Sequence, residues 1–134
     1  MISDNFLQLA IQTAKSSPSK RRVGAVLLKK SKVVSTAVNL EQKSHPLQAK
    51  LATKVGLHEK IYLHAEIYSL IKAKEDADTI IVARVNSQNK LRMAKPCPIC
   101  TLALEQEGIK NIYYTTNEGF MYKFSPDVDN LEIE

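Results

Sequence analysis

The strongest constraint on the fold is an apolar run, TIIVARV, at residues 79–85. Its β-branched residues are typical of a strand, and its continuous apolar character indicates burial on both faces of a sheet. Such a strand needs other layers packed on both sides of the sheet. The run therefore predicts a layered α/β domain.

Segments of helical and strand character alternate along the rest of the chain. Helices are predicted at residues 3–16, between Pro46 and Gly56, and at residues 64–74 and 97–108, from apolar spacing and from Pro and Gly at their ends. Residues 86–96 read as a polar loop.

Two hairpins are predicted. Residues 23–28 and 32–38 flank a short polar turn, and residues 112–116 and 120–124 flank Asn117, Glu118 and Gly119. Gly24 within the first strand predicts the close approach of another backbone or of a ligand. The expected fold is one domain over residues 1–134, with a five-stranded mixed sheet flanked by helices.

Composition bounds the setting of the protein. The chain has 134 residues and a net charge of +5, which favours an anionic partner such as a nucleotide or a nucleic-acid strand, with a solvated lysine-rich surface as the alternative. No apolar run approaches the roughly 20 residues that span a bilayer, so no membrane is expected. The first residues lack the features of a secretory signal, so a cytoplasmic location is expected.

The chemistry is concentrated in two motifs, HAE at 64–66 and PCPIC at 96–100. One imidazole and two thiolates suit zinc, and three protein ligands leave a place for water, as in catalytic sites. Because Cys97 and Cys100 are three residues apart at a predicted helix start, both sulfurs can reach one ion, and the helix end favours thiolate. The alternative is a redox CxxC, with His64 only capping a helix.

Glu66 follows His64 by two residues, a spacing that places its carboxylate beside a metal rather than on it. There it can take a proton from metal-bound water, whose pKa zinc lowers to roughly 7, and deliver it to a leaving amine. His45 and His58 are interpreted as surface or capping residues.

The combination H-x-E and P-C-x-x-C resembles the zinc box of the cytidine/deoxycytidylate deaminase superfamily. RRVGAVLLKKSKVVSTAVN is similar to that family's first hairpin, and the resemblance covers about two-thirds of the chain. Small deaminase-like proteins of bacteriophages are the most similar, which implies action inside a bacterial host. The resemblance implies a cytidine-deaminase-like three-layer fold, a Zn²⁺ cofactor and a homo-oligomeric assembly.

The resemblance also implies roles by position. His64, Cys97 and Cys100 would be metal ligands, and Glu66 would be the proton shuttle. The substrate-binding residues would include Ala65, through its backbone N–H to the base carbonyl.

Further substrate contacts are expected at the sugar and the phosphate. By resemblance, Asn39 would hold the sugar or base edge, although it can also simply close a turn. Arg21 and Arg22 could grip a phosphate or belong to a solvated loop, and Arg22 is the substrate-binding candidate of the pair. Lys95, beside the zinc box, could meet a phosphate as well.

The branch within the superfamily is not fixed by these features. A direct hairpin between the last two strands resembles the free-nucleoside enzymes, yet those enzymes usually have Cys where this chain has His64. The favoured function is hydrolytic deamination of a cytosine base in a free nucleotide or nucleoside, with a dCMP-like substrate preferred. The alternatives are a cytosine or adenine deaminase of single-stranded nucleic acid, of editor or toxin type, and a non-catalytic zinc-stapled binding module.

Overall fold

The computed structural model describes residues 3–57 and 62–124, with residues 120–124 described by their backbone alone. The helices are α1 (Asp4–Lys15), α2 (Pro46–Lys54), α3 (Ala65–Lys72) and α4 (Pro98–Gln106). The strands are β1 (Arg22–Lys29), β2 (Lys32–Val38), β3 (Leu40–Ser44), β4 (Tyr62–Leu63), β5 (Thr79–Val85), β6 (Leu91–Arg92), β7 (Asn111–Thr116) and β8 (Gly119–Phe124).

The main sheet is mixed, as predicted. Its strand order is β2-β1-β5-β7-β8, and β5 and β7 run parallel whereas the other pairs are antiparallel. The predicted hairpin of β7 and β8 is confirmed, with Thr116 paired to Gly119, so that the turn consists of Asn117 and Glu118. Gly119 has a φ of 126°, which glycine adopts without strain.

Two small features depart from the prediction. The loop expected at 86–96 contains β6, which pairs with the end of β5. β3 and β4 pair with each other in a separate two-stranded sheet. β4 and β6 have two residues each, too few to show a period in the sequence.

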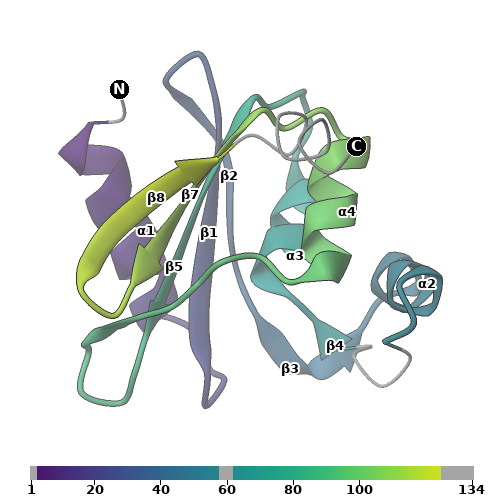
Figure 1. Cartoon of the computed structure of the whole chain (residues 1–134), viewed down its shortest axis with the longest axis horizontal. Helices are drawn as coiled ribbons and strands as arrows, with labels where there is room; N and C mark the ends of the chain where they lie inside the picture. The colour runs from purple at the N-terminus through teal and green to yellow at the C-terminus, as the bar shows by residue number, and fades with distance from the viewer. Residues whose placement is uncertain (1–2, 58–61, 125–134) are drawn as a thin grey trace.

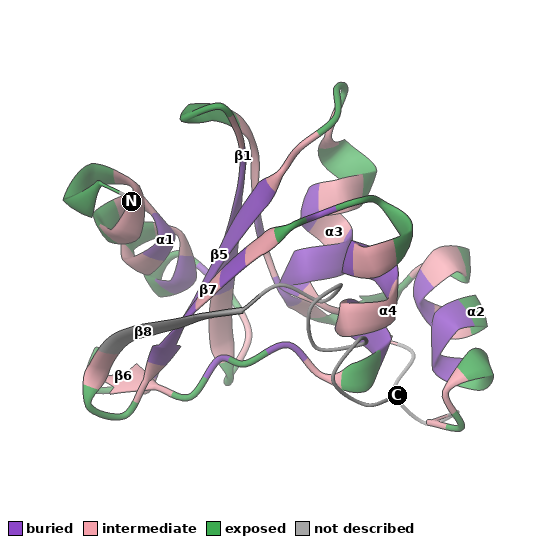
Figure 2. Cartoon of the chain, turned by 45° about the horizontal axis from the view of Figure 1, so that its top comes forward, coloured by how far each residue is buried: buried purple, intermediate pink, exposed green. Residues whose placement is uncertain are grey.

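The layers follow from the burial of β5 on both faces (Figure 1). Ile81, Ala83 and Val85 pack with α1 on one face. Ile80 and Val82 share the opposite face with residues of α3 and α4. Figure 2 shows the buried part of β5 lying between α1 on one side and α3 and α4 on the other. The predicted three-layer fold is confirmed.

Gly24 marks the closest approach of α1 to the sheet. A Cβ built at this position would lie 2.4 Å from the backbone nitrogen of Ala14, a distance that real side chains do not tolerate. The predicted close approach is therefore made by the backbone of α1.

The remaining expectations concern helix ends and membranes. His45 caps α2, because its Nδ1 accepts a hydrogen bond from the N–H of Leu47. His58 lies outside the described residues. None of the helices in residues 3–57 and 62–124 has the length and apolar character to cross a bilayer.

Candidate active site

Three metal-binding side chains converge where α3 and α4 begin. His64 precedes the first residue of α3, Cys97 precedes the first residue of α4, and Cys100 lies in the first turn of α4. Nδ1 of His64 lies 3.2 Å from Sγ of Cys100 and 3.6 Å from Sγ of Cys97. All three ligand atoms lie within 4.8 Å of one another, as the sequence predicted.

These distances fit a zinc ion. With Zn–N bonds of about 2.0 Å and Zn–S bonds of about 2.3 Å, tetrahedral coordination separates nitrogen and sulfur ligands by about 3.5 Å. The observed N···S distances of 3.2 and 3.6 Å bracket that value. Among the described residues, this is the one group of three or more metal-binding side chains that come this close together.

The two thiols differ in acidity. The hydrogen bond with Cys100 lowers the pKa of Cys97 to about 4, and His64 acts in the same direction while burial opposes both. Burial raises the pKa of Cys100 well above its usual value, and Cys97 adds to this effect. A divalent cation bound at this site would stabilise both sulfurs as thiolates.

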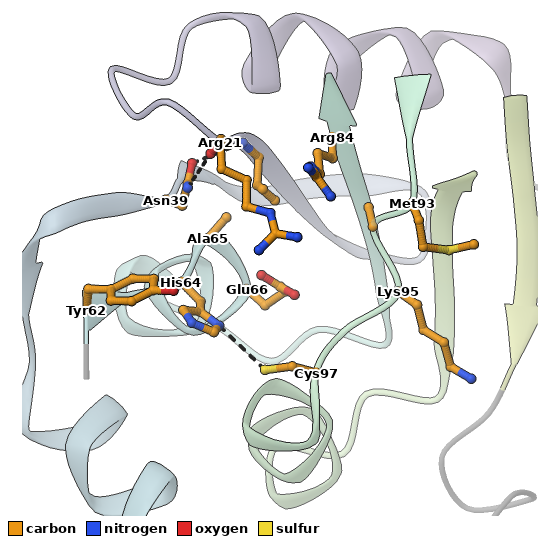
Figure 3. Close-up of a pocket in the computed structure, with 12 residues that line it drawn as sticks. Arg21, Asn39, Tyr62, His64, Ala65, Glu66, Arg84, Met93, Lys95 and Cys97 are labelled. Atoms are coloured by element: carbon orange, nitrogen blue, oxygen red, sulfur yellow. Dashed lines mark hydrogen bonds between the residues drawn. The ribbon is translucent and has the colours of Figure 1, made fainter. Parts of the chain in front are cut away.

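Glu66 lies beside this donor set in the first turn of α3. Its side chain is 6% exposed, and burial raises the pKa of its carboxyl above the usual range although His64 opposes the shift. A carboxyl with a raised pKa can both accept and donate a proton near neutral pH. Figure 3 shows Glu66 pointing into the cavity next to His64 and Cys97.

A second layer of residues holds His64 in place. The fully buried Gln48 of α2 accepts a hydrogen bond of 3.2 Å from the backbone N–H of His64 through its Oε1. The ring of Tyr62 lies 5.4 Å from the His64 ring, with a tilt of 42°. No sequence pattern indicates either contact, because both depend on how α2 and β4 fold back onto α3.

The donor set opens into a cavity of about 240 Å³. Its lining comes from four parts of the chain: the residues around the start of β1, the residue after β2, the segment from β4 to the first turn of α3, and the segment from the end of β5 to α4. The lining residues are Arg21, Val23, Asn39, Tyr62, His64, Ala65, Glu66, Arg84, Met93, Ala94, Lys95 and Cys97 (Figure 3).

Asn39 lines the cavity and also braces it. Its Oδ1 accepts hydrogen bonds from the N–H of Val23, at 3.0 Å, and from the hydroxyl of Ser17, at 2.8 Å. Its Nδ2 donates to the backbone carbonyl of Arg21 at 2.5 Å. Since an amide nitrogen carries two protons, one N–H of Asn39 remains for a substrate.

The structure does not bring Arg22 into the cavity. Its guanidinium donates to the carbonyl of Asn86 and, at 2.7 Å, to Oδ1 of Asn89. Arg21 lines the cavity instead. Successive residues of a strand face opposite ways, so Arg22 continues the face that packs against α1 and Arg21 the face that packs against α3.

Two other cationic residues line the cavity. Lys95 contributes to its rim, and its side chain points away from Glu66 in Figure 3. Arg84, near the end of β5, was not among the predicted site residues. Period-two alternation would have found it, because Arg84 shares its face with Ile80 and Val82.

The donor set and the buried carboxyl define a class of protein, the hydrolases whose metal keeps a coordination position open. Residues 2–116 match the model of the cytidine and deoxycytidylate deaminase zinc-binding region, and the chain belongs to this family. The predicted family is thereby confirmed, and so is the expected Zn²⁺ cofactor of a zinc-type deaminase. No curated protein sequence shows significant similarity to the chain.

Solved structures share the fold. Cytidine deaminase from Burkholderia pseudomallei matches with a TM-score of 0.67 and 19% identity over 96% of this chain and 95% of that chain. The dCMP deaminase of cyanophage S-TIM5 in apo form matches with a TM-score of 0.51 and 23% identity over 86% of each chain. A structure of tRNA:A34 deaminases, from work on A-to-I editing, matches with a TM-score of 0.52 and 20% identity over 84% of this chain and 75% of that chain.

Proposed function

We propose that this chain is a zinc-dependent hydrolase that deaminates the cytosine base of a free nucleotide or nucleoside, giving a uracil product and ammonia. The observation that carries the proposal is the convergence of one imidazole and two thiol groups beside a buried carboxyl in a single cavity. The catalytic unit is the single domain of residues 1–134.

His64, Cys97 and Cys100 would hold the zinc ion, which when bound lowers the pKa of coordinated water to about 7. Glu66 would take one proton from the attacking water and deliver it to N3 of the base, where it stays. It would then carry the remaining hydroxyl proton to the leaving amine, as the new C4–O bond becomes a carbonyl. The C4–O bond forms, the C4–N bond breaks, and ammonia leaves. The buried position of Glu66 supports this role, since burial raises the pKa of its carboxyl above the usual range.

Ala65 and Asn39 would orient the base. The backbone N–H of Ala65, in the first turn of α3, has no partner within the helix and would donate to the base carbonyl. Asn39 offers its remaining N–H to the sugar or base edge. A cavity of about 240 Å³ supports a small substrate, since sites for drug-sized ligands measure about 300–1,000 Å³.

Turnover tests the proposal directly. Zinc-loaded protein is incubated with cytidine, deoxycytidine, dCMP and dCTP, with adenosine as a control base, and ammonia release is measured. We expect release from at least one cytosine substrate and none from adenosine. No release from any cytosine substrate, with one zinc per chain measured, would reject the proposal.

A second candidate is deamination of cytosine or adenine in single-stranded nucleic acid. The net charge of +5 and the arginines of the cavity favour it. Turnover of an oligonucleotide at a higher kcat/KM than any mononucleotide, with salt-sensitive binding, would support it. A non-catalytic zinc-stapled module is disfavoured by Glu66, because a structural site needs no buried carboxyl beside its ligands.

A further inference from the structure

The end of the cavity away from the cysteines carries a group of arginines. In Figure 3, Arg21 and Arg84 lie beyond Glu66 as seen from Cys97, and both line the cavity. Arg92 of β6 pairs directly with Arg84 of β5. Because directly opposite residues of an antiparallel pair lie on the same face, the two arginines are cross-strand neighbours.

These positive charges are close enough to affect one another. Partial burial lowers the pKa of Arg84, and the charges of Arg21 and Arg92 lower it further. Among the described residues, none of the three guanidinium groups forms an ion pair with a carboxylate, and the nearby Glu41 accepts a hydrogen bond of 3.2 Å from the backbone N–H of Arg21. Like charges placed opposite one another destabilise a sheet unless an anion lies between them.

The backbone beneath the arginines is fixed by side-chain hydrogen bonds. The buried hydroxyl of Thr115 accepts from the N–H of Arg84 at 3.1 Å and donates to the carbonyl of Arg92 at 2.7 Å. Asn39 holds the carbonyl of Arg21 in the same way. The three positive charges are therefore carried on a backbone that side-chain hydrogen bonds hold in place, which lowers the ordering cost of binding an anion.

We propose that Arg84, with Arg21 and Arg92, forms an oxyanion subsite that binds the 5′-phosphate of a nucleoside monophosphate whose base is held at Glu66. The inference rests on the proposed function, because it assigns the far end of the same cavity. Guanidinium groups pair with phosphate oxygens in bidentate fashion and stay charged at any physiological pH. A phosphate would supply the missing negative charge and select nucleotides over nucleosides.

The test compares substrates that differ only in the phosphate. We expect the zinc-loaded wild-type protein to favour dCMP over deoxycytidine in kcat/KM. Arg84→Gln should lower kcat/KM for dCMP by about 10- to 100-fold and change that for deoxycytidine by less than about threefold. Arg84→Lys should recover part of the loss. The matched control is Lys20→Gln, which removes one charge from an exposed side chain outside the cavity.

The affinities of dUMP and deoxyuridine, measured by calorimetry, repeat the comparison without turnover. Arg21→Gln serves as a second variant if Arg84→Gln does not fold. Equal kcat/KM on dCMP and deoxycytidine in the wild type, or equal losses on both in the variants, would overturn the subsite and leave deamination intact. Turnover of no cytosine substrate at all would instead reject the proposed function, and the dUMP comparison would still decide on the subsite. Faster, Arg84-dependent deamination of a cytosine-containing oligonucleotide would overturn the assignment to a mononucleotide.

Discussion

The two ends of the cavity are built from different kinds of structure. At one end, His64, Cys97 and Cys100 occupy the starts of two helices, each within a short motif. At the other end, Arg21 immediately precedes β1 and Arg84 lies on the neighbouring strand β5, far away in the sequence. At the helix-start end, the spacing of residues within each short motif places the ligands. At the strand end, the arginines come together only because β1 and β5 pair in one particular register.

The difference has a mechanical consequence. The two cysteines move together because they share one helix turn, and His64 is tied to α2 through Gln48. The arginine end depends on single hydrogen bonds from Asn39 and Thr115. Damage to the helix-start end should therefore abolish the chemistry, and damage to the strand end should weaken substrate selection.

Removal of the metal has the largest expected effect. Chelation, or the Cys100→Ala substitution, should reduce ammonia release from cytosine substrates to background, since two protein ligands hold zinc poorly. Metal content is measured by atomic emission, alongside binding of dUMP, which should persist in weakened form through the arginines. Full zinc occupancy in Cys100→Ala would contradict the ligand assignment.

Glu66→Gln should lower kcat by about 10²- to 10⁴-fold, because the amide cannot accept the proton of the attacking water. Zinc content and the Tm should stay near wild type, since the side chains have the same shape. Assays of ammonia release with dCMP and with deoxycytidine measure the decrease in kcat, which should be the same factor for both substrates. A kcat within threefold of wild type would remove Glu66 from the mechanism.

Asn39→Ala should have a smaller effect of two kinds. It leaves the N–H of Val23 without its partner and should lower the free energy of unfolding by about 1–3 kcal/mol, measured by urea denaturation. It also releases the backbone of Arg21, so KM should rise more for dCMP than for deoxycytidine. The exposed Gln88→Ala is the control, with an expected change below about 0.5 kcal/mol.

Gly24→Ala tests the face of the sheet that lies away from the cavity. The added methyl group would press on the backbone of α1, and overpacking of this kind costs about 1–3 kcal/mol. Because α1 covers the opposite face, kcat/KM of the folded protein should change by less than about twofold. Thermal unfolding measures the loss of stability, and dCMP kinetics measure kcat/KM. A loss of activity without a loss of stability would contradict the view that α1 acts only on the face of the sheet away from the cavity.

The sequence by itself determined the layered fold and the metal end of the site. The run at 79–85 is buried on both faces as predicted, and both hairpins form. Proline and apolar spacing already indicate that His64, Cys97 and Cys100 stand at helix starts, although His64 meets the two cysteines only because α3 packs beside α4. Local patterns within a few residues indicate each helix, strand and helix start in these predictions.

The tertiary structure alone decided the arginine end. The choice between Arg21 and Arg22 depends on which way the first residues of β1 face, and a shift of one residue would exchange them. Arg84 and Arg92 become neighbours only when the two-residue strand β6 folds back on β5. Contacts of this kind arise from pairing between segments distant in the chain, and no local pattern of residues encodes them.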